Sequence, residues 1–269
     1  AVSPIALSAA DLALAALLVV ANAALSLWLS LGLHRQLVVA GLRTVLQLIL
    51  VGLVLKTLFA LSSPAWTGAM VTVMIVVAGY EIRARQERRL AGLWSYGLGT
   101  ASILLAATMV TVLALAGLVQ PEPWYAPRYA IPLLGMVLGN CMTGISLGLD
   151  TLFSGAVRER AAIEARLALG ADRRAAFENV VRRALRAGLI PIINAMSAAG
   201  LVSLPGMMTG QILAGVDPLT AVKYQILIMF LISGSTGIGV FVAVFAGARL
   251  LSDARHRLRL DRLSPANDR

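Results

Sequence analysis

The sequence predicts an all-α integral membrane protein with about seven transmembrane helices. Apolar residues make up 59% of the chain and charged residues only 13%, which is a membrane composition rather than that of a soluble domain. Several apolar segments reach or approach the roughly 20 residues that a helix needs to cross a bilayer. Basic residues collect in every second interval between those segments. We therefore expect a single transmembrane domain over residues 1–269.

Seven apolar segments are candidates for membrane helices. The third is the shortest, and the sequence does not determine whether it crosses the membrane fully. They are about Ile5–Leu33, Val38–Leu61, Ala65–Tyr80, Tyr96–Val119, Ile131–Phe153, Leu189–Gly215 and Ala221–Ala248.

The basic residues predict the orientation. Of the 23 lysines and arginines, all but Lys56, Arg128 and Lys223 lie in four alternate intervals. Those intervals are His34–Arg43, Glu81–Trp94, Ser154–Gly188 and the tail from Arg249. Because cytoplasmic loops are enriched in Lys and Arg, we expect the N-terminus outside, the C-terminus in the cytoplasm, and a cytoplasmic tail at about 249–269. The net charge of +10 then reflects topology and does not indicate a nucleic-acid partner.

The longest polar interval, about 154–188, predicts a bent helical element in the cytoplasm. Gly170 is suited to end a helix in the left-handed conformation. Asp172 stands at the N-cap position of a second helix, Arg173 to Leu185. Apolar and small side chains share one face of it and arginines the other. On that basic face we expect Arg182, Arg183 and Arg186 to contact membrane lipid headgroups.

The run E-A-x-x-x-L-G-A in this interval resembles the EAA loop of ABC-transporter membrane subunits. In that family the loop is a coupling helix that docks into a cleft on an ATP-hydrolysing partner. The resemblance implies an ATPase-coupling role for Glu164, Ala165, Leu169, Gly170, Ala171, Arg173 and Phe177. The alternative is a solvated loop without a partner.

The fifth and sixth apolar segments are unusually polar, and Pro191 and Pro205-Gly206 interrupt the sixth. Polar groups and broken helices at membrane depth face protein or a water-filled path. Because a cation crossing hydrocarbon needs oxygen or sulfur ligands, we predict a substrate pathway of Asn140, Met142, Asn194, Met207, Met208 and Gln211, with Glu81 as a cytoplasmic entry charge. Met207 and Met208 are candidates for transient metal contact, and no fixed metal site is expected.

Each of these assignments has a plainer alternative. Methionine often fills gaps in a core, and Glu81 is also placed to pair with Arg85 one turn away. The GxxxG pairs Gly144/Gly148 and Gly206/Gly210 predict close packing between helices.

The chain has no nucleotide-binding motif. Its single Lys-Thr pair, Lys56-Thr57, follows Leu55 instead of the glycine of a P-loop. We expect no enzyme activity and no bound cofactor in this chain, with ATP and Mg on a separate ATPase.

Over most of its length the chain resembles the Fet-type (FetB-like) iron-exporter permease family, long catalogued as an uncharacterised family of membrane proteins. The residues that carry the resemblance are Leu42–Leu55, Leu134–Asp150, Glu164–Ala171 and Ser203–Ile232. The resemblance implies a bacterial inner-membrane permease that forms a homodimer, recruits two copies of an ABC-type ATPase and exports iron or another metal ion. Cys141 replaces the family's polar residue after Asn140.

Three alternatives stay open at this stage. The same fold is compatible with export of an organic or nucleotide-sugar substrate, as plant relatives suggest. An ion-coupled secondary transporter would not need the EAA corner. A membrane scaffold would not need polar, broken central helices.

Overall fold

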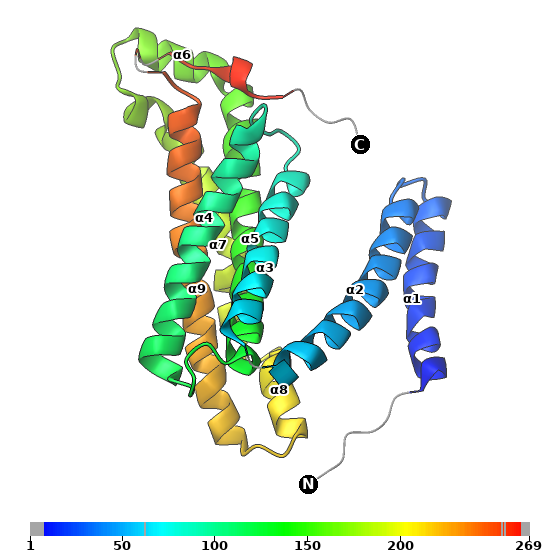
Figure 1. Ribbon diagram of the computed structural model, residues 1–269. Helices are drawn as coiled ribbons and strands as arrows, with labels where there is room; N and C mark the ends of the chain where they lie inside the picture. Colours follow the sequence, from blue (N-terminus) through cyan, green and yellow to red (C-terminus); the bar gives the residue numbers. More distant parts are fainter. Residues whose placement is uncertain (1–7, 62, 254, 256, 265–269) are drawn as a thin grey trace.

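The computed structural model describes residues 8–61, 63–253, 255 and 257–264. Over these residues the fold is all-helical (Figure 1). The helices are α1 (Ala9–Trp28), α2 (His34–Leu61), α3 (Pro64–Arg85), α4 (Leu93–Val112), α5 (Pro127–Arg158), α6 (Arg160–Ala168), α7 (Arg173–Ala198), α8 (Gly206–Leu213) and α9 (Pro218–Leu250). A π-helical stretch, η1 (Leu113–Val119), continues α4, and a 3₁₀ turn, η2 (Leu260–Arg262), lies in the tail.

Within the described residues, six helices are long and apolar enough to cross a membrane: α1, α2, α3, α4 with η1, α5 and α9. The predicted class, an all-α multi-pass membrane protein, is confirmed. The short third segment is part of a 22-residue helix, which is long enough to cross. The interval His34–Arg43 is not a loop but the first turns of α2, because the connection after α1 needs only a few residues.

The sixth predicted segment differs most from the sequence prediction. The helix that starts at Arg173 does not end at Leu185 but continues through Pro191 to Ala198, so the predicted interruption at Pro191 is wrong. Proline is tolerated inside a membrane helix that packs against neighbours, and α7 packs against both α5 and α9. The chain leaves helical geometry only at Ala199–Pro205, after which the short α8 follows.

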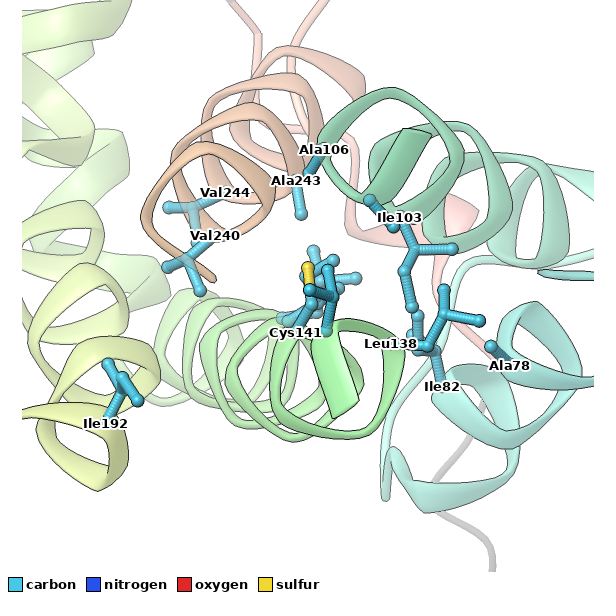
Figure 2. Packing of buried hydrophobic residues seen from close by; sticks show 14 of the residues in the cluster. Ala78, Ile82, Ile103, Ala106, Leu138, Cys141, Ile192, Val240, Ala243 and Val244 are labelled. Carbon is cyan, nitrogen blue, oxygen red and sulfur yellow. The ribbon is translucent and has the colours of Figure 1, made fainter. Parts of the chain in front are cut away.

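The core of the bundle surrounds α5, which packs against α3, α4, α7 and α9. Figure 2 shows side chains from these helices directed into one apolar cluster, among them Ile82, Ile103, Cys141, Ile192 and Val244. The α1–α2 hairpin stands apart from this bundle (Figure 1), and Leu58 is the one buried residue of α2. The bundle is therefore a packed body with a loosely attached hairpin.

The tail folds back onto the loop between α3 and α4. The backbone N–H of Ala91 donates to Arg262 O at 2.7 Å, and that of Ser264 donates to Arg89 O at 2.8 Å. The backbone N–H of Arg257 is the main cause that lowers the pKa of Asp253 to about 2, with further donation from the Arg257 side chain and from Arg255 N–H. Hydrogen bonds therefore fix the described part of the tail at this end of the bundle.

The backbones of α5 and α7 come close together where the two helices cross. A Cβ added to Gly144 would lie 2.9 Å from the carbonyl oxygen of Gly188, and one added to Gly188 would lie 2.8 Å from the carbonyl oxygen of Gly144. Val240 of α9 lies against both glycines. The packing predicted for the Gly144/Gly148 pair is therefore present, whereas a Cβ added at Gly206 or Gly210 would meet nothing within 4 Å among the described residues.

We expect Gly144→Ala to destabilise the bundle, because the new methyl group meets a backbone oxygen that has no room to move. Overpacking of this kind typically costs about 1–3 kcal/mol. Gly210→Ala is the matched control, since nothing lies within 4 Å and alanine favours a helix. Thermal unfolding of both variants in detergent measures the difference. Equal melting temperatures would contradict the crossing.

Candidate functional site

The candidate coupling corner comprises α6, the connection Leu169–Asp172 and the first turns of α7. Gly170 has φ +87°, the left-handed conformation that the sequence predicts there. The carboxylate of Asp172 accepts a hydrogen bond from Ala175 N–H at 2.8 Å, which is the predicted N-cap. The Arg166 side chain donates to the carbonyl oxygen of Ala175 at 3.1 Å and so joins α6 to α7. The corner is a defined turn and not an open loop.

The outer side of the corner presents both charge and apolar surface. Leu169 is 89% exposed at the turn, and the neighbouring Glu164 is exposed and pairs with Arg160 at 2.8 Å. Ala165 is exposed and Ala171 half-buried on the same element. The outer side of the corner therefore exposes one large apolar side chain and one ion pair to solvent.

The inner side of the corner is anchored in the core. Phe177 is 1% exposed, and Ala184 is fully buried one helical repeat further along the same face. The predicted apolar face of this helix is therefore confirmed. Because α7 is continuous over 26 residues, it extends about 39 Å from the corner into the bundle.

The predicted pathway residues do not converge at one point. Met207 and Gln211 line a hollow of about 240 Å³ between α5, α8 and α9, which we call the α8 hollow. The side-chain oxygen of Gln211 is buried there without a hydrogen-bond partner among the described residues. Met136 lines the same hollow, so two methionines and one glutamine are among its lining residues.

A second hollow of about 510 Å³, the α2–α3 groove, lies between α2, α3 and α5. Glu81 and Met142 line it. Glu81 pairs with Arg43 of α2, and the Arg85 side chain stands 4.0 Å away. Glu81 thus connects the α1–α2 hairpin to the bundle.

Three predicted pathway residues line neither hollow. Asn140 and Asn194 lie on the exposed faces of α5 and α7, and Met208 is half-buried on α8. The amide of Asn140 donates to Met136 O of its own helix at 2.9 Å. In a single copy of the chain, Asn140 and Asn194 therefore face outward, and Met208 does so in part.

Sequence reasoning missed Arg43 and Arg128. Arg43 was assigned to a loop, and its partner Glu81 lies on another helix, so only the fold brings them together. Arg128 lines the α8 hollow and lies over the ring of Phe59 at 5.9 Å. The sequence could have singled out Arg128, because it is one of only three basic residues outside the four arginine-rich intervals.

The described ranges contain no group of three or more His, Cys, Asp or Glu side chains placed to hold a metal ion.

These features define an all-helical, multi-pass membrane protein with a structured corner at one end. A family model described as Uncharacterised protein family (UPF0014) matches residues 9–251, and the chain belongs to this family.

Three relatives are similar over most of their length. A membrane protein of the same family from Synechocystis is 46% identical over 215 residues, which cover 78% of this chain and 80% of the relative. The probable iron export permease protein FetB of Escherichia coli is 32% identical over 253 residues, 94% of this chain and 95% of that one. The protein ALUMINUM SENSITIVE 3 of Arabidopsis thaliana is 34% identical over 216 residues, 80% of this chain and 77% of that one. No solved structure matches. The resemblance to FetB-like permeases is thus confirmed.

Proposed function

We propose that this chain is the membrane-spanning permease subunit of an ATP-binding-cassette exporter that moves iron or another metal ion out of the cell. A separate ATPase subunit drives it, and ATP and Mg bind to that subunit. The chain itself is a transport subunit and not an enzyme, in keeping with the permease name of its Escherichia coli relative.

The observation that carries the proposal is the coupling corner on a continuous helix. An ATPase that moves the corner would move α7 as a rigid rod, because Phe177 is held in the core and Gly188 contacts the backbone of α5. Motion at the ATPase would thus reach the centre of the bundle. An ion-coupled secondary transporter needs no such link.

The arrangement also supports an outside N-terminus and a cytoplasmic C-terminus. In Figure 1, α7 and α8 together run from the end that carries α6 to the opposite end, where α9 begins. With the six long helices they would make seven crossings. The α1–α2 turn, the α3–α4 loop, α6 and the tail then share one side, the side of the arginines. We place this side in the cytoplasm of a bacterial cell with the chain in the inner membrane.

Two copies of the permease with two ATPases would complete the transporter. The outward positions of Asn140 and Asn194 support a homodimer, because polar groups at membrane depth are costly against lipid. A second copy would cover them and bring the two polar faces together in the pathway.

Metal is the favoured cargo because the names of two relatives refer to iron export and to aluminium, and because methionine and glutamine, which carry sulfur and oxygen ligand atoms, line the α8 hollow. A second candidate is an organic substrate. Arg128, Tyr129 and Tyr224 line the same hollow, and an apolar hollow with a few polar groups is typical of small-molecule sites.

Gly170→Val should abolish recruitment of the ATPase, since a β-branched residue resists a φ of +87°. Nothing lies within 4 Å of the new Cβ, so the effect is one of backbone conformation and not of crowding. Gly170→Asn is the control, because asparagine tolerates this conformation. Co-purification of the ATPase and stimulation of ATP hydrolysis measure the outcome. Wild-type stimulation with the valine variant would show that the corner does not dock the ATPase.

The topology is tested by reporters fused at the C-terminus. A reporter active only in the cytoplasm should give signal, and one active only in the periplasm should not. The reverse result would rule out seven crossings with an outside N-terminus.

Replacing Met207 and Met208 together with leucine should abolish metal export, while expression and ATPase binding remain. Leucine nearly conserves volume, so the packing cost stays below about 1.5 kcal/mol per site. Because Met207 lines the α8 hollow and Met208 does not, Met207→Leu alone should lose most of the export and Met208→Leu should lose little. ATP-driven iron uptake into inside-out vesicles that contain the ATPase measures this. Full uptake by the double variant would remove the methionines from the pathway and favour the organic substrate.

A further inference from the structure

A third hollow of about 640 Å³ lies between the first turns of α7 and the last turns of α9, and we call it the arginine groove. Arg173, Arg174, Phe177, Val181, Phe245 and Arg249 are among the side chains that line it. The groove therefore combines three guanidinium groups with an apolar wall.

The three arginines of the groove have no anionic partner within the described part of the chain. None of Arg173, Arg174 and Arg249 forms an ion pair or a side-chain hydrogen bond there. The one carboxylate that lines the groove, Glu178, accepts a hydrogen bond from Arg182 at 2.6 Å. The groove thus keeps an uncompensated positive charge.

The arginines that the sequence singled out for lipid contact are engaged elsewhere. Arg182 is bound to Glu178, and Arg183 pairs with Glu159. The hydrogen bond from Arg183 lowers the pKa of the Glu159 carboxyl. Two of the three predicted lipid contacts are therefore paired with carboxylates of the chain itself.

The apolar wall of the groove continues along α9 away from the arginines. Phe245 is 55% exposed and Phe241 43% exposed, and their rings stack at 6.1 Å. Phe241, Phe245 and Arg249 are spaced four residues apart, so they share one face of the helix. This face changes from aromatic to cationic within two turns, at the end of the long apolar helix α9.

We propose that the arginine groove binds an anionic phospholipid of the leaflet on this side of the membrane. The lipid phosphate accepts hydrogen bonds from the guanidinium groups, which suit phosphate better than an ammonium does. An acyl chain lies along Phe241 and Phe245. A soluble anion would bind the arginines but would leave the aromatic side chains without an apolar contact. A groove that is cationic at one end and aromatic along its wall therefore points to a lipid.

The bound lipid would brace the corner, because Arg173 and Phe177 belong both to the groove and to the start of α7. This site does not depend on the proposed transport activity, since lipid retention is a property of the chain alone.

The test is lipid titration of the purified full chain in neutral detergent, followed by native mass spectrometry. Phosphatidylglycerol should bind at least about tenfold tighter than phosphatidylcholine. Arg174→Gln with Arg249→Gln should reduce phosphatidylglycerol affinity by about tenfold or more, given the size of single basic contacts with anionic lipid. Arg255→Gln with Arg257→Gln, which removes the same charge from the tail, should leave it unchanged.

A second pair of variants tests the role of the aromatic wall. Phe245→Ala should weaken retention of both lipids, whereas Phe230→Ala, at an exposed position of α9 outside the groove, should not. Should the double arginine variant fail to fold, Arg249→Gln and Phe245→Ala alone keep the test complete.

Three results would overturn the proposal. One is equal binding of the two lipids by the wild-type chain. Another is displacement of phosphatidylglycerol by inorganic phosphate at similar concentration, which would make this a phosphate site. The third is unchanged lipid binding by the double arginine variant together with loss of ATPase stimulation, which would make the groove a protein contact.

Discussion

The contact between the backbones of α5 and α7 at Gly144 and Gly188 is the constraint on which the rest of this structure depends. Neither position has room for a side chain, because a Cβ on either glycine would meet the carbonyl oxygen of the other, and Val240 of α9 packs against both. Because the crossing fixes α7 against the core, the other end of α7 is fixed as well. Gly170 and the coupling corner stand at that end, outside the bundle.

The fold divides into a tightly packed part and a loosely held part. The helices α5, α7 and α9 interlock through small residues and form a closely packed body. The α1–α2 hairpin and α8 bury little surface. The hollows lined by Met207 and Gln211 and by Glu81 and Met142 lie where these loose elements meet the body. The pair of Arg43 with Glu81 joins hairpin and body by a polar contact, and the strength of a partly exposed pair depends on its surroundings.

Charge is used in two ways at the arginine-rich end. Some arginines, such as Arg183 and Arg257, are bound to carboxylates of the chain and hold local structure. Others, such as Arg174 and Arg249, have no such partner among the described residues and line an open groove. The positive excess that orients a membrane protein is thus divided between internal support and surface that is free to bind.

The sequence by itself determined the features that depend on neighbours along the chain. Apolar length predicted the membrane helices, and the left-handed glycine at position 170 and the cap at Asp172 predicted the corner, because caps and turns are local. Only the tertiary structure decided that α7 passes through Pro191, since packing against α5 and α9 stabilises it there. Tertiary structure also placed Met207, and not Met208, in the lining of the α8 hollow. It also brought Arg43 of α2 next to Glu81 of α3. Helical periodicity gives the face on which a side chain lies, but which helix lies opposite that face is set by the packing of the whole bundle.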